Sequence, residues 1–125
     1  FTAKFLGLPP IGIFDGFIKD GYLFIADSKV LKIEDVSLNN KNVLVGIRPE
    51  GYLKASKEDE LAFKVEVISI IAQGRDTEVL AKNPTNNETF KIMIRNDDRF
   101  ELGTNYFKVK PNKIYLFDKE SGQRI

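Results

Sequence analysis

The sequence predicts an all-β domain, folded as a barrel or a sandwich. Short segments in which apolar and polar residues alternate recur along the 125-residue chain, and β-branched and aromatic residues are frequent in them. About nine such segments are separated by short stretches rich in Asn, Asp, Gly and Pro, which are typical of turns. A chain of this size buries roughly two-thirds of its unfolded surface, so it can form a stable core without disulfides.

The first expected element is the end of a helix at residues 1–7. Phe1 and Phe5 stand at helical spacing, and Gly7 followed by Pro9-Pro10 is typical of a helix stop. We expect the beginning of this helix to lie outside the chain. The chain also lacks an initiator methionine, which suggests an excerpt from a longer protein.

Three strands are expected next, at residues 11–20, 22–27 and 29–33. Between the first two, the Asp20-Gly21 pair is a strong signal for a two-residue hairpin turn. The Asp27-Ser28 pair is a weaker turn signal before the third strand. This part of the chain therefore predicts a short antiparallel meander.

The remaining expected strands share alternating or continuous apolar patterns, and they span residues 42–48, 60–72, 76–83, 89–95, 104–109 and 113–118. In residues 89–95, Phe90, Ile92 and Ile94 should face the core. The segment 60–72 alternates at first and then becomes apolar on both faces, which indicates a buried end or a bulge near Ser69. A change in composition near residues 52–60 suggests a boundary between two β subunits.

Composition excludes several kinds of chemistry. The chain has no cysteine and no histidine, so disulfides, thiolate metal sites, imidazole ligands and histidine-dependent triads are excluded. Its 19 Lys and Arg against 18 Asp and Glu give no electrostatic sign of nucleic-acid or membrane binding. No apolar run reaches membrane-spanning length, and no signal peptide is recognisable, so we expect a soluble, cytoplasmic protein.

Candidate chemical groups are few. A phosphate-binding loop is absent from the sequence, and we assign no catalytic, cofactor-binding or metal-binding residue. The acidic clusters Glu58-Asp59-Glu60 and Asp97-Asp98 are interpreted as solvated loops rather than metal ligands. The aromatic residues Phe14, Phe17, Tyr22 and Phe24, with Lys19 among them, fit a stacking platform for single-stranded nucleic acid. The interpretation that most of them are core residues is favoured.

The most distinctive stretch is VLVGIRPEGY, residues 43–52. Val43, Val45 and Ile47 should face the core, and the strand must end before Pro49, which cannot donate to a strand ladder. Proline also holds the preceding Arg48 extended. The triplet Arg48-Pro49-Glu50 therefore fixes where two oppositely charged side chains leave the sheet.

This stretch resembles the Gly-Ile-Arg-Pro-Glu motif in the C-terminal regulatory (TOBE) domain of sugar-type ABC transporter ATP-binding subunits, of the maltose, multiple-sugar and glycerol-phosphate kind. FTAKFLGLPP resembles the junction after the ATPase domain, VISIIAQGRDTEVLAK the central segment, and KIYLFDKESGQRI the ending. The matching positions are Phe5, Gly7, Pro9, Gly46, Ile47, Arg48, Pro49, Glu50, Leu116, Phe117, Asp118 and Gly122. Ile11-Gly12 and Gly51 depart from the residues usual in the family.

The resemblance implies an OB-fold-like barrel of short antiparallel strands with extra strands. Residues 1–8 would be the tail of a missing ATPase domain and its linker, and residues 9–125 the regulatory domain. ATP and Mg²⁺ would belong to the missing domain, so this fragment should not be an enzyme. The motif residues Gly46, Arg48, Pro49, Glu50 and Asp118 would be structural or lie at an interface.

The implied partners are a second copy of the domain, the ATPase domain of the parent chain, the transporter's membrane subunits and a cytoplasmic regulator in some members. The parent would lie at the inner face of the membrane, and nucleic acid is not expected. Two alternatives of another class are a small-anion-binding module of the molybdate type and a single-strand nucleic-acid-binding OB-like domain. For the motif itself, we predict that Arg48 is at least half buried and anchored by Glu50, Asp118 or backbone carbonyls, against the alternative of a solvated arginine.

Overall fold

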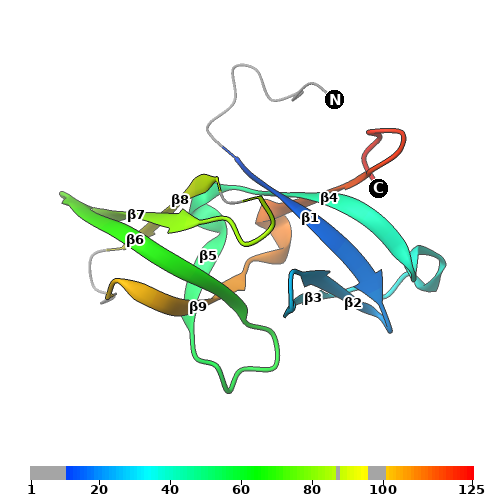
Figure 1. Cartoon of the computed structure of the whole chain (residues 1–125), viewed down its shortest axis with the longest axis horizontal. Coiled ribbons are helices and arrows are strands. Elements are labelled where there is room, and N and C mark those ends of the chain that lie inside the picture. The colour runs from blue at the N-terminus through cyan, green and yellow to red at the C-terminus, as the bar shows by residue number, and fades with distance from the viewer. Residues whose placement is uncertain (1–10, 87, 96–100) are drawn as a thin grey trace.

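The computed structural model describes residues 11–86, 88–95 and 101–125, and these form two antiparallel sheets around one core (Figure 1). The fold prediction is therefore confirmed as all-β. The expected helix at residues 1–7 and the Asp97-Asp98 cluster lie outside the described residues. Within the described part, no helix has the length and apolar character needed to cross a membrane.

The first sheet has the strand order β10-β4-β1-β2-β3. Its strands are β1 (Gly12–Lys19), β2 (Tyr22–Ile25), β3 (Ser28–Lys32), β4 (Lys41–Ile47) and β10 (Ile114–Asp118). The second sheet has the order β5-β9-β6-β7-β8. Its strands are β5 (Tyr52–Ala55), β6 (Phe63–Gln73), β7 (Asp76–Lys82), β8 (Thr89–Arg95) and β9 (Gly103–Val109). We call the first sheet the β1 sheet and the second sheet the β6 sheet.

The hairpin between β1 and β2 forms where the sequence predicted it. Asp20 and Gly21 have φ angles of 53° and 80°, and Lys19 pairs with Tyr22 on either side of them. Positive φ at both central residues gives a turn whose twist matches that of the strands. The next turn differs by one residue from the prediction, because Ile25 pairs with Ser28 and the turn is Ala26-Asp27, with φ of 54° at Ala26.

The predicted bulge in β6 is confirmed. Val67 pairs with Ala81 and Ser69 with Leu80, so Ile68 is the extra residue in the ladder. One strand was not predicted: no strand was expected between residues 48 and 60, whereas β5 lies there and pairs with β9. β5 is short and lies at a sheet edge, and its exposed residues are one apolar and one charged residue, Leu53 and Lys54, so its pattern is weak.

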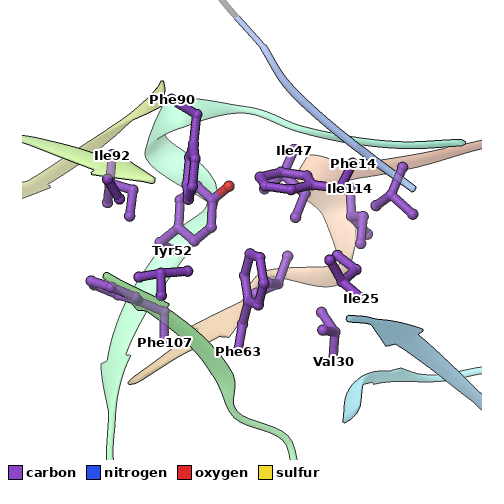
Figure 2. Packing of buried hydrophobic residues seen from close by; sticks show 14 of the residues in the cluster. Phe14, Ile25, Val30, Ile47, Tyr52, Phe63, Phe90, Ile92, Phe107 and Ile114 are labelled. Carbon is purple, nitrogen blue, oxygen red and sulfur yellow. The ribbon is translucent and has the colours of Figure 1, made fainter. Parts of the chain in front are cut away.

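One apolar core joins the two sheets. Phe14 of β1 contacts Phe63 of β6 and Phe90 of β8 edge-to-face, with ring centroids 5.3 and 4.8 Å apart (Figure 2). Side chains from all ten strands contribute to the buried cluster. The alternation predicted for β8 holds, because Phe90, Ile92 and Ile94 are all buried. The composition change near residues 52–60 falls where the chain leaves the β1 sheet for the β6 sheet.

Candidate functional site

Among the described residues, the chain passes between the sheets at two short 3-10 turns. η1 (Val36–Leu38) lies within the β1 sheet's connections, whereas η2 (Pro49–Gly51) joins β4 to β5 and η3 (Pro111–Lys113) joins β9 to β10. Both crossover turns have proline near their start and a cation, Arg48 or Lys110, just before it. Proline supplies no ladder donor, so each strand ends as the chain changes sheet.

The two crossover turns are hydrogen-bonded to each other. The Arg48 N–H donates to the Lys113 carbonyl at 3.1 Å, and the Lys110 N–H donates to the Gly51 carbonyl at 2.8 Å. A Cβ placed on Gly51 would lie 2.7 Å from the Cβ of Lys113. Glycine at position 51 is therefore what allows the turns to approach this closely.

Arg48 has the carboxylate partner that the sequence suggested. Its Nε donates to Oε2 of Glu50 at 2.9 Å, and the same oxygen lies 3.6 Å from Nζ of Lys113. The Arg48 side chain is 26% exposed, so the prediction that it is at least half buried is confirmed. The guanidinium also donates to the Tyr115 hydroxyl, and Arg124 lies 4.8 Å from the centre of the Tyr115 ring.

The charged side chains at η2 shift one another's pKa values. Partial burial raises the pKa of Glu50, but the hydrogen bond from Arg48, a backbone hydrogen bond and the nearby Lys113 charge outweigh it, and the net pKa is lowered. The hydrogen bond to Glu50, followed by its charge, raises the pKa of Arg48. Both groups are therefore held in their charged forms at neutral pH.

Asp118 has a separate role at the end of β10. Its Oδ1 accepts from the N–H groups of Glu120 (2.8 Å) and Ser121 (3.3 Å), and its Oδ2 lies 3.2 Å from Nζ of Lys41. These backbone hydrogen bonds, and then Lys41, lower the pKa of Asp118. The structure thus places Asp118 in the final turn, paired with Lys41 and not with Arg48.

Gly46 is the last residue but one of β4, on the face that also carries Arg48. It pairs with Ile13 on one side and Tyr115 on the other. A Cβ at this position would lie 3.2 Å from Cγ2 of Ile11 and 3.6 Å from Cδ1 of Ile13. The absence of a side chain here lets the start of the described chain pack across β4, as a close-approach glycine does.

A second junction between the sheets was not predictable from the sequence pattern. Asn83 is 3% exposed, its Nδ2 donates to the Ile13 carbonyl at 2.8 Å, and its Oδ1 accepts from both the N–H and the hydroxyl of Thr85. The Thr85 hydroxyl in turn accepts from the Asp15 N–H at 3.3 Å. In the sequence, Asn83 is the last residue of the expected strand 76–83 and Thr85 follows it in the polar stretch NPTNNE, which shows no sign of burial.

Residues of the acidic cluster at 58–60 form hydrogen bonds and an ion pair within their loop and with neighbouring strands. Asp59 accepts from the Ser56 N–H at 2.8 Å and lies 3.6 Å from Nζ of Lys108. Glu60 accepts from the Tyr22 hydroxyl at 3.1 Å. Across the described ranges, no three Asp, Glu, His or Cys side chains form a group able to hold a metal ion.

The four aromatic residues of β1 and β2 do not share one environment. Phe14 is fully buried, but Phe17, Tyr22 and Phe24 are half-buried. The interpretation that most of them are core residues is therefore wrong for three, because the two strands present alternate residues to opposite faces. Nζ of Lys29 lies 4.2 Å from the centre of the Tyr22 ring, so one face of that ring is occupied.

Comparison with known proteins identifies relatives over the whole chain. The sn-glycerol-3-phosphate import ATP-binding protein UgpC of Jannaschia is 27% identical over 125 residues, covering all of this chain and 34% of that protein. The putative ABC transporter ATP-binding protein MG187 of Mycoplasma genitalium is 28% identical over 126 residues, covering all of this chain and 21% of that protein. MsmK of Streptococcus mutans, a multiple sugar-binding transport ATP-binding protein, is 36% identical over 58 residues, covering 40% of this chain and 15% of that protein.

The chain matches the C-terminal part of sugar-type ABC ATP-binding proteins. It spans about one third or less of the length of these relatives. No family model matches the chain.

A solved structure supports the OB-like architecture. The molybdate-binding protein ModG, in a crystal form with molybdate bound, superposes with a TM-score of 0.57 over 84% of this chain and 94% of that chain. At 13% sequence identity the likeness concerns the fold alone. The OB-like fold implied by the sequence resemblance is thereby confirmed.

Proposed function

We propose that this chain is the regulatory and dimerisation domain of the ATP-binding subunit of a carbohydrate-type ABC importer. The observation that carries the proposal is the match over the whole chain to an import ATP-binding protein and a putative ABC transporter ATP-binding protein, of which it covers only 34% and 21%. The remaining two-thirds or more of such a subunit would bind ATP and Mg²⁺. The domain would be non-catalytic by itself.

The architecture suits a domain that transmits force or holds position. The two sheets share one core. The chain passes between them twice, at the hydrogen-bonded turns η2 and η3, and Asn83 joins them a third time. Such a unit resists shear between its sheets, because any sliding breaks packed contacts and buried hydrogen bonds. It would serve as a stable body that pairs with a second copy while the ATPase domains open and close.

The proposed partners follow from this role. They are a second copy of the domain, the ATPase domain of the parent chain, the membrane subunits of the transporter and a cytoplasmic regulator. The parent would be peripheral at the inner face of the cell membrane. Pairing of isolated domains should be weak, because the ATPase domains that raise their effective concentration are missing.

The test compares the full-length subunit with a version that lacks residues 9–125. ATP hydrolysis should persist in the shortened subunit, whereas light scattering should show a smaller dimer fraction, and transport in reconstituted vesicles should lose its coupling to hydrolysis. A shortened subunit with unchanged dimer fraction and coupling would contradict the proposal.

The isolated chain supplies a second test. Calorimetric titrations with ATP, molybdate and a single-stranded oligonucleotide should show no saturable binding. Saturable ATP binding would contradict the assignment of nucleotide chemistry to the missing part. Saturable binding of molybdate or the oligonucleotide would favour the corresponding alternative function.

A further inference from the structure

The dipeptide Asp-Gly occurs twice in the chain, at Asp15-Gly16 and at Asp20-Gly21. An aspartate followed by glycine is especially prone to form isoaspartate, because glycine has no side chain to hinder its backbone nitrogen or restrict its rotation. The first pair lies inside strand β1, and the second forms the turn between β1 and β2. The chain therefore contains the same reactive pair in two structural settings.

Isoaspartate forms in two steps, and water is the only other reactant. In the first step the glycine nitrogen bonds to Cγ of the protonated aspartate, the Cγ–OH bond breaks, and the hydroxyl leaves with the amide proton as water. In the second step water opens the resulting succinimide ring. Attack at the side-chain carbonyl restores aspartate, whereas attack at the main-chain carbonyl gives isoaspartate. In isoaspartate the main chain runs through Cβ and Cγ and is one carbon atom longer.

The backbone of the closed turn keeps the reacting atoms of Asp20 and Gly21 apart. Asp20 is exposed, and the φ angles of 53° and 80° identify a turn in which ψ of the first central residue is about 30°. At that ψ the Gly21 nitrogen lies nearly opposite the Asp20 Cβ across the Cα–C bond. Ring closure requires both atoms on the same side of this bond, so the peptide group between the two residues must first rotate.

Hydrogen bonds from two other segments oppose that rotation. The Gly21 N–H donates to Oδ1 of Asn39 at 3.0 Å, and the Gly21 carbonyl accepts from the Ile33 N–H at 2.7 Å. Asn39, which follows η1, is itself held in place because the Asn40 N–H donates to the Ile18 carbonyl at 2.6 Å. The nitrogen that would attack is therefore bound by a side chain, and rotation of its peptide group breaks that bond.

The Asp15-Gly16 pair is protected by the sheet itself. Gly16 is buried and pairs with Ile25 of β2 on one side and with Val43 of β4 on the other. The Asp15 carboxylate lies 3.2 Å from Nζ of Lys119. Rotation of this peptide group requires separation of three strands over the core, whereas the tip of a hairpin opens by local fluctuation at a much lower cost in free energy.

From this comparison we infer that Asp20 is a modification site, at which the chain forms isoaspartate, and that Asn39 controls the rate by holding the Gly21 nitrogen. The reaction proceeds from the open hairpin. A two-residue turn between Lys19 and Tyr22 does not accommodate an additional main-chain atom, so the product loses the β1–β2 register.

The modification would also reach the core, because Leu23 and Ile25 of β2 are fully buried there. Isoaspartate at residue 20 would therefore loosen one end of the β1 sheet and mark the chain irreversibly. The inference concerns the covalent chemistry of these residues, and it does not depend on the proposed role in a transporter.

The test follows isoaspartate in the folded 125-residue chain during several weeks at neutral pH. An isoaspartyl methyltransferase with radiolabelled S-adenosylmethionine measures the total amount, and mass spectrometry of proteolytic fragments locates it. Synthetic peptides of residues 12–18 and 17–23 give the rates without a fold. We expect Asp20 to react at least about tenfold more slowly than in its peptide, and Asp15 to react more slowly still.

Three variants test the control by Asn39. Asn39→Ala removes the acceptor and should accelerate the reaction at Asp20 about fivefold, while the rate at Asp15 stays low. Asn39→Asp retains an acceptor oxygen and should react within about twofold of the unmodified sequence. Asn42→Ala changes an exposed asparagine of β4 and is the matched control, for which no change is expected. The rate at Asp15 also reports any general unfolding in these variants.

Four outcomes would overturn the inference. The first is isoaspartate at Asp15 as early as at Asp20, and the second is none at Asp20 when the peptide of residues 17–23 has been fully converted and the incubation has run to its end. The third is an unchanged rate at Asp20 in Asn39→Ala, or equal acceleration in Asn39→Ala and Asn39→Asp. The fourth is equal acceleration at Asp15 and Asp20 in Asn39→Ala, which would show that Asn39 supports the whole fold and not this turn.

Discussion

The two crossover turns have the same construction but different surroundings. In η2, Pro49 and Gly51 are buried, whereas η3 contains no buried residue. The position equivalent to Gly51 in η3 is Lys113, and its Cβ is the atom that Gly51 must leave room for. Packing therefore constrains η2 at Pro49 and Gly51, while η3 has to preserve only its backbone.

This difference explains why η2 is the more distinctive of the two turns in the sequence. Arg48-Pro49-Glu50 combines a strand end, a buried proline and an ion pair, each of which restricts the residue type. Lys110-Pro111-Asn112 forms the same turn in an exposed position, where most polar residues would serve. Substitutions in η2 should therefore destabilise the fold more than their counterparts in η3, and substitutions in the shared core more than either.

The largest effect should come from the core that both crossovers serve. Phe14→Ala removes a fully buried ring that contacts Phe63 and Phe90 of the other sheet. We expect a loss of about 3–5 kcal/mol in the free energy of unfolding, measured by urea denaturation. A loss below about 1 kcal/mol would show that the crossovers, and not the core, hold the sheets together.

The next largest effect should be at Gly51. Gly51→Ala places a Cβ against the Cβ of Lys113, an atom too close to the backbone to move aside. Separation of the turns should cost about 1–3 kcal/mol in urea denaturation. The matched control in η3, Asn112→Ala, changes an exposed residue and should cost about 0.5 kcal/mol or less. Equal costs would contradict the contrast between the turns.

The two prolines give the most direct comparison. Replacing either proline by alanine makes the unfolded chain more flexible, which costs about 0.4–1 kcal/mol. Pro49→Ala also removes packed atoms, since Pro49 is buried and Pro111 is exposed. Pro49→Ala should therefore lower the thermal midpoint more than Pro111→Ala. The reverse order would show that η3 is the more constrained crossover.

Much of the fold was predictable because strand patterns reflect burial on one face. The alternation of Val43, Val45 and Ile47, the turn at Asp20-Gly21 and the bulge next to Ser69 all follow from local chemistry. The pairing of Arg48 with Glu50 was also predictable, because the two residues are close in sequence and proline fixes the backbone between them.

Other features depend on contacts between distant segments. Asn83 is buried only because the loop that contains it folds against Ile13, 70 residues away. Lys54 belongs to a strand because β9 supplies its ladder partners. Arg95 and Lys110 likewise line one groove only because the chain returns across the two sheets. No local sequence pattern predicts these contacts.

The ion pair at η2 should make a small, pH-dependent contribution. Because the pKa of Glu50 in the folded chain lies below its ordinary value of 4.5, its contribution is present above that value and is lost as the pH falls through the folded pKa. Glu50→Gln should lower the thermal midpoint by a few degrees at neutral pH, and this difference should shrink in acid. A pH-independent difference would mean that Glu50 stabilises η2 through packing rather than charge.

The smallest effect is expected at the residue that follows η2. Tyr52 is 2% exposed, and among the described residues its hydroxyl has no hydrogen-bond partner (Figure 2). Burial raises the pKa of Tyr52 well above the usual value, so the hydroxyl remains neutral. A buried hydroxyl without a partner has lost its hydration, whereas phenylalanine fills nearly the same volume without that cost.

Tyr52→Phe should therefore leave the free energy of unfolding unchanged or raise it by up to about 1 kcal/mol in urea denaturation. Tyr115→Phe is the matched control, because its hydroxyl accepts from Arg48, and removing it should be destabilising. A destabilised Tyr52→Phe variant would show that the hydroxyl is hydrogen-bonded in solution. The buried crossover would then be fixed by a polar contact as well as by packing, which would sharpen its contrast with η3.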